Sequence, residues 1–168
     1  MITATRTAYT LVDSPIGPLL LTGDERGLRS LHMAPHTPDR AWREDPRPFA
    51  DATLQLEQYF AGERTEFELE LVPEGTPFQQ QVWGLLREIP YGETRSYGQL
   101  AAALGKGPRA ARAVGLANGR NPIAVIVPCH RVIGADGSLT GFGGGLDRKR
   151  ALLAHEAEVR EGFRSTLW

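Results

Sequence analysis

The stretch Asn121-Pro122-Ile123-Ala124-Val125-Ile126-Val127-Pro128-Cys129-His130-Arg131-Val132 joins five consecutive apolar residues to the only cysteine of the chain. A short apolar run bounded by turn residues is typical of a strand that is buried on both faces, so residues 123–127 are predicted to form one. That strand would deliver Cys129 at its end. Because neighbouring side chains of a regular strand point to opposite faces, Cys129 and His130 can pair only if the chain bends, which Pro128 favours.

The residue types around Cys129 indicate nucleophilic chemistry. A thiol becomes a strong nucleophile once it loses its proton, and an imidazole is well suited to take that proton near neutral pH. Asn121-Pro122 and His155-Glu156 are candidates for orienting the imidazole or the backbone. The hypothesis is a reactive cysteine with a base and a carboxylate; the alternative is a buried structural thiol. One cysteine permits neither an intramolecular disulfide nor a multi-cysteine zinc site.

On both sides of this stretch, residues 76–168 are predicted to form a mainly helical domain. Thr76-Pro77 is a typical helix start, since a capping residue precedes proline, and Pro90-Tyr91-Gly92 ends that helix. Two short helices separated by Gly105-Lys106-Gly107 predict a helix-turn-helix. The predicted helices cover residues 76–89, 97–104, 108–118 and 147–156.

Residues 1–75 are predicted to form a separate domain with a small antiparallel sheet and one helix. Short apolar runs separated by turn residues indicate three strands, and apolar residues at helical spacing indicate a helix that ends before Gly62. The strands are expected at residues 9–12, 18–21 and 28–31, an irregular loop at 34–48, the helix at 49–60 and an extended linker at 65–75.

The charge of the chain is unevenly distributed. The formal net charge of the 168 residues is −1, but residues 1–75 hold 7 basic and 13 acidic residues whereas residues 76–168 hold 12 and 7. No acidic residue lies between Glu93 and Asp136. This segment either contacts phosphates or exchanges salt bridges with the acidic half, and charge alone does not decide. Its basic residues are Arg95, Lys106, Arg109, Arg112, Arg120 and Arg131.

The apolar content excludes some classes of protein. Hydrophobic residues make up 41% of the chain and charged residues 23%, which is typical of a folded domain rather than a disordered one. No apolar stretch approaches the roughly 20 residues of a membrane span, and the first residues lack the apolar core of a signal peptide. We expect a soluble cytoplasmic protein that does not engage membranes.

The segment around Cys129 strongly resembles the active-site segment of the O6-alkylguanine-DNA alkyltransferases, or methylated-DNA–protein-cysteine methyltransferases. The resemblance continues through Ile89–Leu100, Ala110–Gly115, Gly143–Gly145 and Leu152–Glu156, and it is dense over residues 76–157. It implies a mixed α/β (α+β) fold, with a ribonuclease-H-like N-terminal domain and a winged-helix-like C-terminal domain that contains the helix-turn-helix.

The resemblance also implies roles for individual residues. Cys129 would accept the alkyl group of O6-methylguanine, His130 would draw the thiol proton through a bridging water, and Glu156 would hold the imidazole as the third member of a triad. Asn121 would brace the turn, and Tyr97 would donate its hydroxyl to a guanine ring nitrogen. The backbone carbonyls of Cys129 and Val132 would accept hydrogen bonds from the exocyclic amine of the guanine.

Duplex DNA that contains O6-alkylguanine is the implied partner. The target base must be flipped out of the helix, and Arg112 would fill the gap it leaves while small residues let the second helix approach the minor groove. The implied DNA-binding set is Arg112, Ala110, Ala111, Ala113, Ser96 and Arg109. Val132, Phe142 and Gly143 would line the pocket; Phe142 and Gly143 stand where other members carry hydroxyls, which alters how O6 is contacted.

The implied activity is direct reversal of DNA damage by a methyltransferase that acts once, without a cofactor or metal. A monomer is expected; cooperative assembly on DNA, the range of alkyl groups and repair of O4-methylthymine are left open. The main alternative is a non-catalytic protein that binds alkyl lesions, but such proteins lack the acceptor cysteine. A cysteine hydrolase would not explain the acid-free segment, and a sequence-specific regulator would not use an alanine-rich reading helix.

Overall fold

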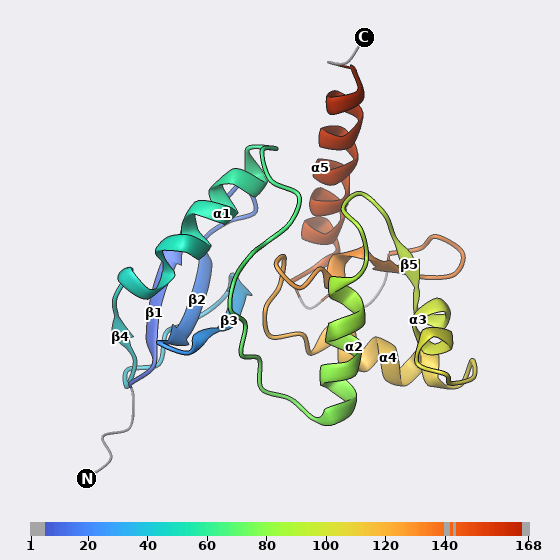
Figure 1. The fold of residues 1–168 in the computed structure, drawn as a ribbon, viewed down its shortest axis with the longest axis horizontal. Helices are drawn as coiled ribbons and strands as arrows, with labels where there is room; N and C mark the ends of the chain where they lie inside the picture. The colour runs from blue at the N-terminus through green and yellow to red at the C-terminus, as the bar shows by residue number, and fades with distance from the viewer. Residues whose placement is uncertain (1–5, 140–141, 143, 166–168) are drawn as a thin grey trace. The chain divides into compact units, whose positions relative to one another are not determined.

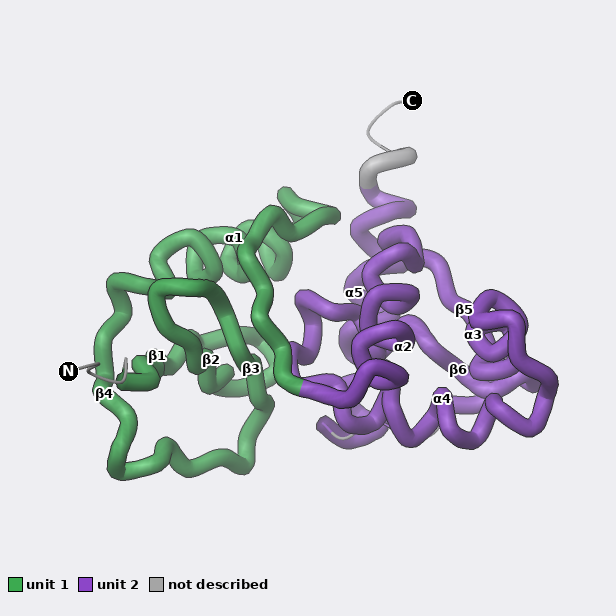
Figure 2. Tube along the Cα trace, turned by 60° about the horizontal axis from the view of Figure 1, so that its bottom comes forward, with its two compact units in different colours: residues 1–74 green, residues 75–168 purple. Residues whose placement is uncertain are grey.

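The computed structural model describes residues 6–139, 142 and 144–165, with side chains as far as Gly162. The chain divides into two compact units, residues 1–74 and 75–168 (Figure 2). The mixed α/β fold expected from the sequence is confirmed by elements of both kinds.

Unit 1 is built on a four-stranded sheet in the order β3-β2-β1-β4. The first three strands form an antiparallel meander, in which β1 (Ala8–Val12) pairs with β2 (Leu19–Asp24) and β2 pairs with β3 (Gly27–Met33). Helix α1 (Ala50–Phe60) lies along one face of the sheet (Figure 1). The apolar side chains at helical spacing in α1 face inward, and the core includes the fully buried Leu21, Leu31, Leu56 and Tyr59.

The prediction of an irregular loop at residues 34–48 is partly wrong. Strand β4 (Arg43–Glu44) forms there and pairs in parallel with β1, and the 3-10 helix η1 (Arg47–Phe49) follows. Both β4 residues are exposed, so no apolar alternation marks the strand; the β1 backbone defines it by accepting bonds from the Arg43 and Asp45 amides. The predicted linker at 65–75 is extended and adds a parallel bridge between Leu71 and Leu28.

In unit 2, helices α2 (Pro77–Arg87) and α3 (Tyr97–Ala103) begin directly after residues whose side chains cap them, as the Thr76-Pro77 pair predicts for the first of them. Thr76 caps α2 and Ser96 caps α3. Each hydroxyl accepts the amide of the glutamine at the third helical position, and the side-chain oxygen of that glutamine accepts the amide of the capping residue. Helix α4 (Ala110–Gly119) starts two residues later than expected and lies beside α3 (Figure 1). Gly105, in the turn between them, has a φ of +73°, a conformation that glycine adopts at little cost.

The buried strand predicted at 123–127 is wrong: these residues form a tight turn. Val125 has a φ of +71°, and the Val127 amide donates back to the Ile123 carbonyl over 3.0 Å. An apolar run indicates burial, which the structure confirms, but it carries no periodicity that distinguishes a strand from a buried turn.

The backbone after this turn forms short elements that lead into the last helix. The 3-10 helix η2 (Cys129–Arg131) leads into β6 (Val132–Ile133), which pairs in parallel with β5 (Arg95–Ser96). Helix α5 (Leu146–Ser165) is about twice as long as the segment predicted at 147–156.

Trp83 ties α2 to α4. Its ring is buried, and its indole Nε1 donates over 2.9 Å to the Ala117 carbonyl near the end of α4, which also accepts the Arg120 amide over 3.2 Å.

We expect Trp83→Phe to lower the free energy of unfolding by about 1–3 kcal/mol, because phenylalanine leaves the buried carbonyl without the indole donor. Urea unfolding followed by circular dichroism measures the loss. Trp42→Phe, at a partly exposed ring in unit 1, is the matched control and should cost less. Equal losses in the two variants would contradict the assignment.

Candidate active site

The side chain of Asn121 holds the turn that presents Cys129. Its Nδ2 donates to the Val127 carbonyl over 2.8 Å, and its Oδ1 accepts the Ile123 amide over 3.0 Å. Pro128, with φ −82° and ψ 65°, then bends the chain into η2. The bend that the sequence argument required is therefore present, and Cys129 and His130 are consecutive residues of one helical turn instead of a pleated strand.

Behind the thiol, His130 is bonded to Glu156 of α5. The imidazole Nε2 lies 2.8 Å from Glu156 Oε2, and both side chains are fully buried. Because a carboxylate only accepts, Nε2 carries the proton and Nδ1 is the basic nitrogen. Nδ1 is buried without a hydrogen-bond partner among the described protein atoms. This arrangement leaves a proton acceptor beside Cys129 in sequence.

Arg131 shares the same carboxylate. Its Nε donates to Glu156 Oε1 over 2.8 Å and its Nη2 to Oε2 over 3.0 Å, while Nη1 donates to the Ile89 carbonyl over 2.7 Å. The Gly92 amide also donates to Oε1, and the Tyr91 ring lies 5.5 Å from the guanidinium carbon. Arg131 is thus a buried structural cation, and the expectation that counted it among phosphate-contacting residues is not supported.

The pKa values follow from burial and from these bonds. Burial raises the pKa of the Cys129 thiol, although the Asn121 side chain and the Lys149 charge act against it. Burial lowers the pKa of His130, which its bond to Glu156 opposes. Burial would favour protonated Glu156, but the bonds from His130 and Arg131 outweigh it and hold its pKa below the ordinary value. The resting site therefore holds a neutral thiol, a neutral imidazole and a carboxylate.

Lys149 places a buried cation near the Cys129 thiol. It is fully buried on α5 and lies on the same face as Leu152 and Glu156, at intervals of three and four residues. Burial lowers the pKa of Lys149, and the neighbouring Cys129 raises it, so the two groups stabilise each other's charged forms. Lys149 was not predicted from the sequence; its spacing from Glu156 on one helix face was the available signal.

The carbonyl of Cys129 is already engaged. It accepts the Val132 amide and, over 3.3 Å, the Asn118 side chain, so both of its lone pairs have donors. The implied contact of this carbonyl with a guanine amine requires one of them to leave. The carbonyl of Val132, whose side chain is buried, is the other implied acceptor. Asn118 was also missed by the sequence argument.

The helix-turn-helix presents the implied DNA-binding residues on its outer side. Arg109, Arg112 and Ala113 are exposed, and Ala110 and Ala111 are partly exposed. The side chains of α4 that face inward are Val114, Ala117 and Asn118.

Two further implied residues lie at the start of α3. The Ser96 hydroxyl accepts the Gln99 amide as the helix cap. The partly buried Tyr97 ring packs beside Gly115, so that a Cβ added at Gly115 would lie 3.6 Å from the ring carbons. The partly exposed Phe142 accepts the Gly145 amide at its carbonyl, whereas Gly143 lies outside the described residues.

The described residues offer neither a metal site nor a membrane-spanning helix. No group of three or more His, Cys, Asp or Glu side chains in residues 6–139, 142 and 144–162 has an arrangement that could hold a metal ion. Within the same part of the chain, no helix is long and apolar enough to cross a membrane.

Residues 77–158 match the DNA binding domain of 6-O-methylguanine DNA methyltransferase, and residues 7–73 match its ribonuclease-like domain. The chain belongs to this family. A methylated-DNA–protein-cysteine methyltransferase of Mycolicibacterium paratuberculosis is 61% identical over 151 residues, covering 88% of this chain and 91% of the relative. The protein of that name from Methanosarcina acetivorans is 56% identical over 153 residues, covering 88% and 97%.

Solved structures agree with this assignment. The Mycobacterium tuberculosis OGT protein in complex with DNA superposes with a TM-score of 0.86 at 58% identity, covering 90% of this chain and 94% of that chain. The methyltransferase of Pyrococcus kodakaraensis, at 22% identity and a TM-score of 0.61, covers 89% of this chain and 98% of its own and shares the fold. The ribonuclease-like N-terminal half and the DNA-binding C-terminal half expected from the resemblance are confirmed.

In this member of the methyltransferase family, Glu156→Gln is expected to lower the free energy of unfolding by about 3–5 kcal/mol, since it leaves the buried Arg131 guanidinium without its counter-ion. Urea unfolding at pH 7.5 measures this loss in the free energy of unfolding. Glu158→Gln changes an exposed carboxylate on the same helix and should leave stability nearly unchanged. A Glu156→Gln protein as stable as the control would show that the Arg131 pair does not hold the site together.

Proposed function

We propose that this protein reverses O6-alkylguanine lesions in duplex DNA by irreversible transfer of the alkyl group to Cys129. The observation that carries the proposal is the buried array of Cys129, His130 and Glu156 in a chain that belongs to the methyltransferase family. Cys129 is the only cysteine in the sequence, so a transfer to cysteine has one acceptor. Because that thiol must stay reduced to act, we place the protein in the cytoplasm.

The first step is removal of the thiol proton. His130 accepts it at Nδ1, through a bridging water, and becomes an imidazolium whose Nε2 proton remains bonded to Glu156. Glu156 stabilises the new charge, and Lys149 stabilises the thiolate. Arg131 acts through Glu156: two parallel hydrogen bonds fix the plane of the carboxylate. Burial lowers the pKa of His130, and the guanidinium charge of Arg131 acts in the same direction to a smaller extent.

In the second step, the thiolate attacks the alkyl carbon in line with the departing oxygen. A sulfur–carbon bond forms, the carbon–O6 bond breaks, and its electron pair passes into the guanine ring. The Tyr97 hydroxyl eases that charge by donating to a ring nitrogen, and the Val132 carbonyl accepts the exocyclic amine. The thioether that results has no proton to lose and no leaving group, so each molecule acts once.

The DNA-binding steps rest on α4. The target atom lies inside the duplex, so the nucleotide must be flipped into the site. Arg112, exposed near the start of α4, fills the vacated stack, and the small side chains of Ala110, Ala111 and Ala113 allow the helix backbone to approach the groove. Arg109 and Ser96 contact the phosphate backbone. The lesion-binding alternative without transfer is disfavoured because the acceptor and its base are both present.

The proposal predicts one added CH₂ per molecule. Intact-protein mass spectrometry after mixing with an excess of duplex that carries one O6-methylguanine should show a single addition, which peptide mapping places on Cys129. Cys129→Ser should bind the same duplex and gain no mass, because a hydroxyl is a far weaker nucleophile than a thiolate. An unmodified wild-type protein that still binds the lesion tightly would favour the non-catalytic alternative.

A second prediction concerns Lys149. Lys149→Met should raise the pKa of the Cys129 thiol, because it removes a buried cation that favours the thiolate. Below that pKa the rate of alkylation by iodoacetamide should fall by about tenfold for each unit of increase. The measurement is the pH dependence of that rate from pH 6 to 10.

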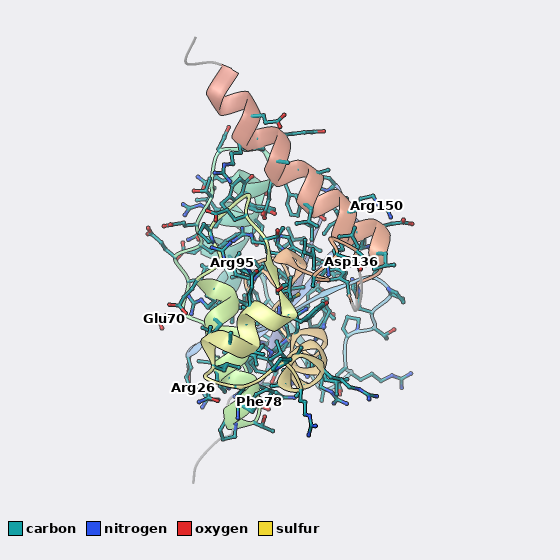
Figure 3. All side chains as sticks on the ribbon, turned by 90° about the vertical axis from the view of Figure 1, so that its right-hand side faces the viewer. Arg26, Glu70, Phe78, Arg95, Asp136 and Arg150 are labelled. Carbon is teal, nitrogen blue, oxygen red and sulfur yellow. The ribbon has the colours of Figure 1, made fainter. Side chains whose placement is uncertain are left out.

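Arg150→Met is the matched control for this experiment. Arg150 follows Lys149 in sequence but points away from α5 (Figure 3), with its side chain 67% exposed. Its loss should leave the thiol profile unchanged. If Lys149→Met also keeps the wild-type profile, then Lys149 is neutral in the folded protein and does not assist the thiol.

A further inference from the structure

The outer face of α4 has one large apolar side chain at its centre. In a helix with 3.6 residues per turn, successive residues are separated by about 100°. Taking Arg112 as the origin, Leu116 lies at about 40° and Arg120 at about 80°, while the buried Val114, Ala117 and Asn118 lie on the opposite side, between about 140° and 240°. Leu116 therefore lies on the outer side of α4, between the two arginines in projection.

Its exposure matches this position. Leu116 is 64% exposed, which is more than the other exposed leucines, Leu11, Leu54 and Leu146. The remaining outward positions of α4 are small, Ala113 and Gly119, so the leucine rises above its surroundings together with the arginines on either side. Whatever docks on this face meets Leu116 together with Arg112 and Arg120.

A single exposed leucine is ordinary on a protein surface and needs no explanation by itself. The setting of Leu116 is what distinguishes it. Arg112 lies four residues before it and Arg120 four residues after it, both are exposed, and no acidic residue lies between Glu93 and Asp136. The face is thus a cationic surface with an apolar centre, whose charge is complementary to that of a polyanion with apolar surfaces between its phosphates.

The minor groove of DNA has this chemistry. Phosphates line its edges, whereas its walls are the C–H groups of the deoxyribose rings, and proteins that open the groove frequently insert apolar side chains. The groove of B-DNA is about 6 Å wide and a helix with side chains about 10–12 Å across, so α4 can enter only if the groove widens.

We propose that Leu116 is a DNA-contacting residue that packs against the deoxyribose walls of the minor groove, one helical turn from Arg112, and holds the groove open while the lesion is flipped. This inference rests on the proposed function. It adds to the implied DNA-binding set a residue whose contribution is apolar. Arg112 and Leu116 then have separate roles: the arginine occupies the vacated stack, and the leucine supports the widened groove beside it.

The test compares Leu116→Ala and Leu116→Asn with wild type on two substrates. With a duplex carrying one O6-methylguanine at sub-saturating concentration, both variants should react about tenfold more slowly, which corresponds to ~1.4 kcal/mol of lost contact. Asparagine keeps most of the bulk but not the apolar surface, so it separates apolar contact from size. With the free O6-methylguanine base, both variants should react at the wild-type rate, because no groove is involved.

Salt dependence and a matched control complete the design. An apolar contact releases no counterion, so Leu116→Ala should lower affinity for duplex without changing the slope of log K against log salt, whereas loss of a phosphate contact, tested with Arg120→Ala, reduces the slope by about 1. Leu54→Ala removes a leucine that is 52% exposed in unit 1 and should match wild type throughout.

Three outcomes overturn the inference: wild-type rates of the variants with duplex, equal losses with duplex and free base, or a changed salt slope in Leu116→Ala. A wild-type protein that transfers no methyl group from duplex would instead refute the proposed function. The two failures are therefore distinguishable in one set of measurements.

Discussion

The carboxylate of Glu156 is the group on which the site depends. It accepts hydrogen bonds from His130, Arg131 and the Gly92 amide, and so joins α5 to η2 and to the turn after α2. A buried carboxylate is costly unless it is paired and fully bonded. The bidentate Arg131 meets that cost with a permanent charge, so Glu156 stays ionised while His130 stays neutral. A base that is neutral at rest can accept a proton when the thiol gives it up.

The turn before Cys129 is held against the preference of its own residues. Val125 has a β-branched side chain and a φ of +71°, a conformation that costs a non-glycine residue about 1–2 kcal/mol. The two hydrogen bonds from the Asn121 side chain and the burial of the apolar run offset this cost. The result is a rigid bend that sets Cys129 and His130 on one helical turn, which a regular strand could not do.

The local features of this fold were predictable from the sequence, whereas its non-local features were not. The Thr76 cap, apolar spacing and the Gly105-Lys106-Gly107 turn located α2, α1 and α3 to within a few residues, because these signals act within a short stretch of chain. The two-residue strands β4, β5 and β6 exist only through their partners and leave no local pattern. The apolar run at 123–127 correctly predicted that these residues are buried, but it wrongly predicted a strand where the chain forms a turn. Within the site, the family motif pointed to Cys129 and His130, but the buried roles of Arg131 and Lys149 depend on how α5 packs.

The proposed chemistry requires His130 to rest as a neutral imidazole with its proton on Nε2 and with Nδ1 free to receive the thiol proton. Nitrogen-15 NMR of protein labelled at histidine reports the protonation of both ring nitrogens directly. At pH 7 we expect a protonated Nε2 and an unprotonated Nδ1 for His130, with the His130→Asn variant used to assign the signals. An imidazolium, or a neutral ring with its proton on Nδ1, would contradict it.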